Sequence, residues 1–190
     1  MNTSSHSPPI VLVFAASDPT SGAGVQADLM ALTSLGCHPL TALTAITVQD
    51  TLGVESVHPV AAELLERQAR LLLEDMQVAA FKIGVLGSVE NVLAVAEIVS
   101  DYPDVPLIFD PVLASGRGDE LSGEHIISAM REMLLPQTTL LTPNAPEARR
   151  SRASASRRST IARRNRIAPR TTPMISPSAA QISMISRNSH

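Results

Sequence analysis

Five carboxylate and carboxamide side chains stand where a ligand could reach them: Asp28 in the first turn of a predicted helix, and Gln49, Asp110, Asn144 and Glu147 at or after the ends of apolar runs. The carboxamide of Gln49 can both donate to and accept from the edge of a heterocycle. Asp110, which Pro111 holds at the end of an apolar run, is a carboxylate of the kind that binds a metal ion or a metal-bound phosphate. Two structural alternatives stay open: a solvated turn for Asp110, and a partner of a helix dipole for Glu147.

A glycine-containing loop precedes Asp28 and offers a second kind of ligand contact. Residues 22–27 (GAGVQA) fit the dinucleotide-binding pattern GxGxxG/A, and free N–H groups at the start of a helix favour an anion. The loop lacks the Gly-Lys-Ser/Thr of a Walker A motif. A nicotinamide-dependent oxidoreductase also needs an acidic residue about 20 positions later, yet residues 38–47 contain none and Asp50 is the first candidate. The oxidoreductase alternative is therefore disfavoured. The alternative that the loop is only a tight turn between a strand and a helix stays open.

These side chains need a scaffold, and the hydrophobic pattern predicts one in which short apolar strands alternate with helices. The predicted strands are 10–14, 40–48, 54–57, 79–84, 107–109 and 138–141, and the predicted helices are 25–35, 61–76, 92–99 after a Ser88 cap, and 122–135. This pattern is typical of an α/β fold with an open, mostly parallel sheet and helices on both faces. The ligand crevice of such a fold lies beyond the carboxyl ends of the strands. Lys82, inside a strand, is predicted as either an edge-strand charge or a paired cation.

Five motifs stand along the chain in this order: 16–28 (ASDPTSGAGVQAD), 41–49 (TALTAITVQ), 82–86 (KIGVL), 110–112 (DPV) and 141–147 (LTPNAPE). Together they resemble the hydroxymethylpyrimidine and phosphomethylpyrimidine kinases of thiamine biosynthesis, a branch of the ribokinase-like superfamily. The resemblance covers about residues 9–148, and five motifs in the right order are far more specific than any one of them. It implies a ribokinase-like α/β fold whose C-terminal part is missing.

The resemblance also implies a role for each matching residue. The residues implied to bind the pyrimidine are Asp28 and Gln49, with walls at Ala16, Ala23, Val85 and Val112. Those implied to bind the ATP phosphates are Asn144, Glu147 and Asp110, of which Asp110 and Glu147 are the implied Mg2+ ligands. The implied reaction transfers the γ-phosphoryl group of ATP to 4-amino-5-hydroxymethyl-2-methylpyrimidine and then to its monophosphate. The family usually has glycine at Ala16 and Ser21, and often methionine at Val85, so the shape of the walls stays open.

Charge is divided unevenly along the chain. Residues 1–148 contain all 18 acidic residues and five basic ones, whereas residues 149–190 contain ten arginines and no acidic residue, Leu, Val or Gly. So abrupt a change predicts the N-terminal part of a kinase domain at 1–148 and a disordered, non-native tail at 149–190, as a shifted reading frame would produce. The family's Gly-Thr-Gly anion hole and its Cys or Asp base are absent after Glu147. No catalytic residue of the family is therefore expected in this chain.

The sequence also limits partners and location. The tail has no aromatic side chain for base stacking, so we expect no nucleic-acid partner despite its charge. No apolar run reaches the roughly 20 residues of a membrane span, and a cytoplasmic protein without a membrane partner is expected. The family commonly forms dimers, which leaves a homodimer open. The functional predictions, in order, are a pyrimidine kinase of impaired activity, a catalytically inactive pyrimidine-binding fragment, and an NAD(P)-binding oxidoreductase domain.

Overall fold

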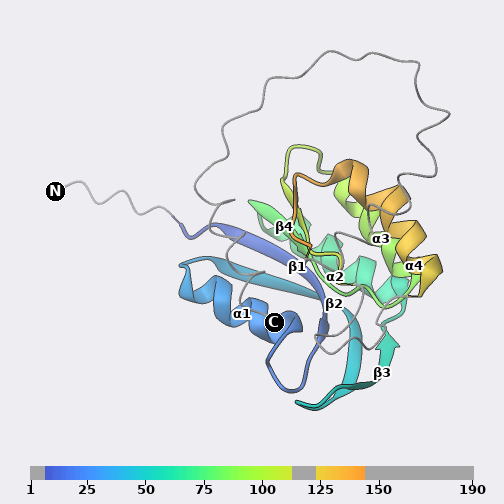
Figure 1. Cartoon of the computed structure of the whole chain (residues 1–190). Helices are drawn as coiled ribbons and strands as arrows, with labels where there is room; N and C mark the ends of the chain where they lie inside the picture. The colour runs from blue at the N-terminus through green and yellow to red at the C-terminus, as the bar shows by residue number, and fades with distance from the viewer. Residues whose placement is uncertain (1–6, 113–122, 144–190) are drawn as a thin grey trace.

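The computed structural model describes residues 7–112 and 123–143, which form an α/β fold (Figure 1). Six strands make one sheet in the order β3-β2-β1-β4-β5-β6. The strands are β1 (Ile10–Ser17), β2 (His38–Gln49), β3 (Val54–Pro59), β4 (Ala80–Ile83), β5 (Leu107–Phe109) and β6 (Leu140–Leu141). β2 and β3 pair antiparallel, and the other neighbouring strands pair parallel. The predicted open, mostly parallel sheet is confirmed.

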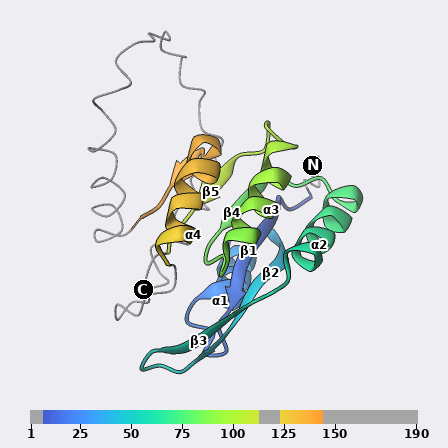
Figure 2. The same ribbon diagram turned by 90° about the vertical axis from the view of Figure 1, so that its right-hand side faces the viewer.

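Helices cover both faces of this sheet, as predicted. They are α1 (Gly24–Ser34), α2 (Ala62–Asp75), α3 (Val89–Ser100) and α4 (Glu124–Ala129). α1 lies on one face, and α2, α3 and α4 lie on the other, where Figure 2 shows them in front of the strands. After α4 the chain continues as a π-helical segment, Met130–Leu134, and a 3-10 turn, Leu135–Gln137. The predicted helix 122–135 is therefore three segments of different pitch, and Pro136, which lacks an N–H, stands in the turn that closes it.

β1 is buried on both faces because it lies in the middle of the sheet. Side chains alternate along a strand, so Val11 and Val13 pack in the cluster with α1, whereas Leu12 and Phe14 pack in the cluster with α2, α3 and α4. The rings of Phe14 and Phe81 lie 6.1 Å apart in the larger cluster. Two cores thus hold the central strands from both sides and fix where those strands end.

The ends of several elements follow from single residues. The Ser88 hydroxyl accepts a hydrogen bond from the N–H of Asn91 (3.1 Å), which confirms the predicted cap of α3. Gly36, at φ +76°, follows α1 in the left-handed conformation expected of a helix-terminating glycine. β1 runs three residues further than predicted because Ser17 still finds a partner in β2, at Ile46. Among the helices of the described segments, none has the length and apolar character needed to cross a membrane.

Candidate active site

The residues that follow the parallel strands lie along one edge of the sheet. Phe14 of β1, Ile83 of β4 and Phe109 of β5 are neighbours across the ladder. Two backbone hydrogen bonds extend this row, because Gly84 N donates to Phe14 O (2.8 Å) and Asp110 N donates to Ile83 O (2.9 Å). The sheet therefore brings Asp110 and the segment after β4 to the same edge as the end of β1. This is the edge at which an open α/β sheet binds ligands.

The loop between β1 and α1 is organised around the buried carboxylate of Asp18, which is 3% exposed. One oxygen accepts from Thr20 N (2.8 Å), and the other accepts from Thr20 Oγ1 (3.0 Å) and Ala23 N (2.9 Å). A carboxylate with three such bonds is a structural group that shapes the loop, including the predicted wall residue Ala23. Its role was missed from the sequence, although an Asp followed two residues later by Thr is typical of this turn.

Two residues of this loop adopt the left-handed conformation, and one of them leaves no room for a side chain. Gly24 has φ +62°, and a Cβ there would lie 2.3 Å from the carbonyl oxygen of Ala16. Ser21 has φ 62° as well. The close approach of Gly24 packs the start of α1 against the end of β1. The glycine pattern thus serves helix–strand packing, whatever ligand the loop meets.

Side chains also tie the end of β1 to its neighbours. Gln26 of α1 accepts from Asp18 N (2.9 Å) through its carbonyl oxygen and donates to Ser17 Oγ (2.7 Å) through its amide nitrogen. Thr47 of β2 donates its hydroxyl to the carbonyl oxygen of Ser17 (2.8 Å). The end of β1 is therefore held from both the helix and the adjacent strand.

Asp28, the predicted pyrimidine contact on α1, forms an ion pair with Lys82 on β4. Lys82 Nζ lies 2.6 Å from Asp28 Oδ2, and the two side chains are 12% and 3% exposed. β4 lies between β1 and β5, so Lys82 is the paired cation of the two predicted alternatives and not an edge-strand charge. The ammonium group lies beside Gly84, the residue that follows β4, since a Cβ there would be in van der Waals contact with Nζ at 3.4 Å. The pair therefore lies where β4 ends, on the side of the sheet that α1 covers.

The segment after β4, which contains the predicted wall residue Val85, is fixed by two buried polar side chains. Thr44 of β2 donates its hydroxyl to Val85 O (2.5 Å). Asn91 of α3, fully buried, donates its amide to Thr44 O (2.9 Å) and Leu86 O (3.0 Å). Neither residue was predicted as part of the site. The available signal was the polar side chain of Asn91 directly before the apolar stripe that begins at Val92.

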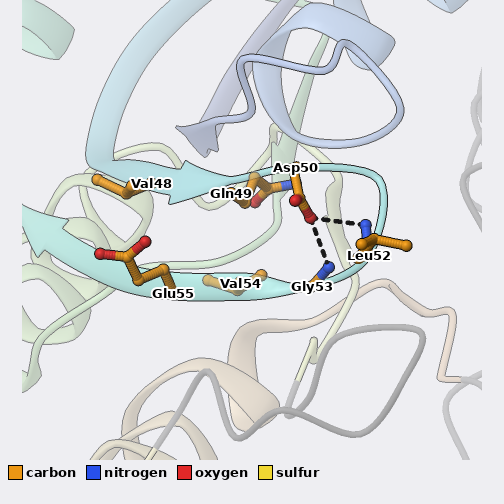
Figure 3. A pocket seen from close by; sticks show the side chains of 7 residues that line it. All are labelled: Val48, Gln49, Asp50, Leu52, Gly53, Val54 and Glu55. Carbon is orange, nitrogen blue, oxygen red and sulfur yellow. Dashed lines mark hydrogen bonds between the residues drawn. The ribbon is translucent and has the colours of Figure 1, made fainter.

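Gln49, the second predicted pyrimidine contact, is the last residue of β2 and lies on the β2–β3 hairpin. The β1–β2 ladder ends at Ile46, so the hairpin extends past the end of β1. A hollow of about 490 Å³ is lined by residues of the hairpin alone: Val48, Gln49, Asp50, Leu52, Gly53, Val54 and Glu55 (Figure 3). The Asp50 carboxylate accepts from Leu52 N (2.7 Å) and Gly53 N (3.0 Å) and so closes the hairpin turn. Asp28 is not among the residues that line this hollow.

Asp110, the predicted metal and phosphate ligand, is buried at the end of β5, with 5% of its surface exposed. The alternative of a solvated turn aspartate is therefore wrong. Its carbonyl oxygen accepts from the N–H of the wall residue Val112 (2.9 Å). Its predicted companions, Asn144 and Glu147, lie outside the described residues. Across 7–112 and 123–143, no group of three His, Cys, Asp or Glu side chains is placed to hold a metal ion.

Comparisons with known proteins agree with this fold and these motifs. A family model described as phosphomethylpyrimidine kinase matches residues 18–168. The hydroxymethylpyrimidine/phosphomethylpyrimidine kinase of Haemophilus influenzae is 40% identical over 138 residues, which are 73% of this chain and 51% of that protein. The chain thus spans about half the length of the curated relatives it matches.

Solved structures give the same result. The crystal structure of phosphomethylpyrimidine kinase from Clostridium difficile superposes with a TM-score of 0.71 and 33% identity, covering 76% of this chain and 63% of that one. Pyridoxal kinase from Staphylococcus aureus, in complex with AMP-PCP and pyridoxal, gives a TM-score of 0.68 and 31% identity over 78% of this chain and 53% of that one. The ribokinase-like fold prediction is confirmed. The chain belongs to the phosphomethylpyrimidine kinase family.

Proposed function

We propose that this chain supplies the pyrimidine-binding part of a hydroxymethylpyrimidine/phosphomethylpyrimidine kinase. The reaction is ATP-dependent phosphorylation of 4-amino-5-hydroxymethyl-2-methylpyrimidine and of its monophosphate, in thiamine biosynthesis. The observation that carries the proposal is the buried carboxylate of Asp28, which α1 holds beside the ends of β1 and β4. Family membership of the matched residues supports the same reaction.

The chemistry of the proposed site suits an aminopyrimidine. The Asp28 carboxylate can accept from the exocyclic amino group, and the Gln49 carboxamide can pair with ring nitrogens. The apolar and backbone walls would come from Ala16, Ala23, Val85 and Val112. Asp18 holds Ala23, and Thr44 holds the carbonyl of Val85. These contacts define two walls before any ligand arrives, which reduces the entropy lost on binding.

The nucleotide half of the proposal rests on Asp110, Asn144 and Glu147. A buried carboxylate at the end of a strand is a hard oxygen donor of the kind Mg2+ prefers, and Asp110 fits that description. When bound, Mg2+ would neutralise charge on the ATP phosphates. The neighbour structure with AMP-PCP supports a nucleotide on this fold. Asn144 and Glu147 would bind the ATP phosphates, with Glu147 as the second Mg2+ ligand.

Turnover by this chain is expected to be low, because its sequence contains no Gly-Thr-Gly anion hole or following base after Glu147. Donors that stabilise developing charge contribute a factor of about 100–1000 each to the rate of group transfer. The proposal therefore separates binding, which the described residues support, from catalysis, which needs groups that they do not include. A catalytically inactive pyrimidine-binding fragment is the limiting case.

Calorimetric titration of the purified chain with 4-amino-5-hydroxymethyl-2-methylpyrimidine, beside a coupled ATP-turnover assay with Mg2+, tests the proposal. We expect measurable binding that Asp28→Ala abolishes. Asp75→Ala, a matched removal of an exposed carboxylate at the end of α2, should leave it intact. Binding without turnover indicates the inactive fragment, and turnover sensitive to Asp28→Ala shows a competent site. Absence of binding by the folded wild-type chain would overturn the proposal.

A further inference from the structure

The Asp28–Lys82 ion pair has a feature that pyrimidine binding alone does not explain. Its ammonium group comes from the middle of a buried strand, between Phe81 and Ile83, where an apolar residue would cost nothing in desolvation. Both partners are nearly buried, and their polar atoms approach to 2.6 Å. Buried ion pairs contribute little to stability on balance, because the attraction is offset by the loss of hydration. The pair is therefore better explained by what it does to the site than by what it adds to the fold.

The contact leaves Asp28 with a defined hydrogen-bonding character. An ionised carboxylate only accepts hydrogen bonds, whereas a protonated carboxyl group both donates and accepts. A buried charge is very costly unless an opposite charge pairs with it. Lys82 supplies the opposite charge at Oδ2. A ligand beside this pair would then meet a carboxylate oxygen that requires a donor.

We propose that Lys82 is a specificity-determining positioning residue that keeps Asp28 as an acceptor-only group. The site then selects pyrimidines with an exocyclic amino group over pyrimidines with an exocyclic carbonyl group. This inference rests on the proposed function. An amino group at that position donates to the carboxylate. A carbonyl oxygen there faces another oxygen, and neither can donate, so the ligand is rejected by electrostatic repulsion and by the loss of a hydrogen bond.

The local packing supports a dedicated place for the ammonium group. Gly84 follows Lys82 by two residues and so lies on the same face of the sheet, and a Cβ at Gly84 would lie 3.4 Å from Nζ and 3.3 Å from the Cβ of Ala15. The tight contact is the one with Ala15, so glycine lets the chain after β4 pass close to β1, and Lys82 Nζ lies beside it. The ammonium thus reaches the ligand-facing edge of the sheet while its stem stays in the strand.

The experiment compares two ligands by calorimetry on three folded proteins. The ligands are 4-amino-5-hydroxymethyl-2-methylpyrimidine and its 4-oxo analogue, and the proteins are the wild-type chain, Lys82→Met and Lys82→Arg. We expect the wild type to prefer the amino compound and Lys82→Met to lower the ratio of the two affinities by about tenfold or more. Lys82→Arg keeps the charge and should restore most of the preference. The ratio is independent of the fraction of protein that is folded, so a loss of stability alone would not change it.

Arg70→Met is the matched control, because it removes an ion-paired cation from α2, where Arg70 contacts Glu66 and Asp101. It should leave both affinities unchanged. If Lys82→Met does not fold, Lys82→Gln removes the charge, keeps a donor near Asp28 and should lower the ratio in the same direction. An unchanged ratio in the folded variant would overturn the inference while leaving pyrimidine binding intact. A wild-type chain that binds neither ligand would overturn the proposed function itself.

Discussion

The β1–α1 loop and the β2–β3 hairpin both contain or position predicted pyrimidine contacts, but they are held in different ways. The loop is closed by the buried Asp18 carboxylate and by a glycine that no side chain could replace without a clash. The hairpin extends past the end of β1, and its tip is closed by the exposed Asp50 through two bonds to its own backbone. Ile46, Val48 and Leu52 are exposed along it (Figure 3 shows the last two).

This difference indicates that the two halves of the proposed site have different physical origins. The Asp28 side of the site is built by contacts among β1, β4 and α1, which share the core of the domain. The Gln49 side depends on a two-stranded ribbon, and such ribbons are weak by themselves. We therefore expect changes in the loop to affect global stability and changes in the hairpin tip to affect it little.

Gly24→Ala should have the largest effect. A left-handed conformation costs about 1–2 kcal/mol for a residue with a Cβ, and the contact with Ala16 O at 2.3 Å adds a backbone clash. We expect a loss of roughly 3 kcal/mol or more in the free energy of unfolding, measured by urea denaturation. Gly36→Ala is the control, since it has φ +76° but nothing within 4 Å of its Cβ. Equal losses in the two variants would show that the clash is relieved by movement of the loop.

Asn91→Asp tests how the base of the hairpin is attached, because Asn91 joins β2 to the segment after β4. The substitution keeps the shape of the side chain but replaces two donated hydrogen bonds with a carboxylate facing the carbonyl oxygens of Thr44 and Leu86. We expect a loss of about 3 kcal/mol by the same measurement. Thr44→Val, which removes one hydroxyl from the same cluster, should cost about 1 kcal/mol. A well-tolerated aspartate would show that the cluster rearranges.

The pair Asp18→Ala and Asp50→Ala compares the two regions directly. Asp18→Ala removes three hydrogen bonds from a buried carboxylate and leaves backbone N–H groups without partners, so about 2–3 kcal/mol should be lost. Asp50→Ala removes two bonds from an exposed turn, where water can replace them, and about 0.5–1 kcal/mol should be lost. Thermal and urea unfolding both report this contrast. Similar losses for the two variants would mean that the hairpin is as integral to the fold as the loop.

Ser21→Gly should have the smallest effect, and of opposite sign. Ser21 has φ 62°, a conformation that glycine adopts without the penalty of a Cβ. We expect a gain of about 0.5 kcal/mol, because relief of strain exceeds the greater entropy of glycine in the unfolded chain. Ser34→Gly, in the last turn of α1, should instead lose about 0.5–1 kcal/mol. Calorimetric melting of both variants measures the sign, and a loss at Ser21 would refute the strain argument.

Much of the fold could be predicted from the sequence because strands and helices have different hydrophobic periods. The buried run that begins at Ile10 and the Ser88 cap of α3 both appear as predicted. The last helix was predicted as one piece, although its pitch changes at Met130, because hydrophobic spacing does not distinguish an α turn from a π turn. The last strand was predicted at four residues and has two, since pairing with β5 determines its length.

The candidate site was predictable in its residue types and less so in its contacts. By itself the sequence determined the family, because its motifs can be recognised without the folded structure. It also determined that polar residues follow the strands. Only the tertiary structure decided that Lys82 is the partner of Asp28, 54 residues away, and that Asn91 joins β2 to the segment after β4. The reason is that a buried polar group must find its partner in space, and the chain brings that partner from whichever element packs beside it.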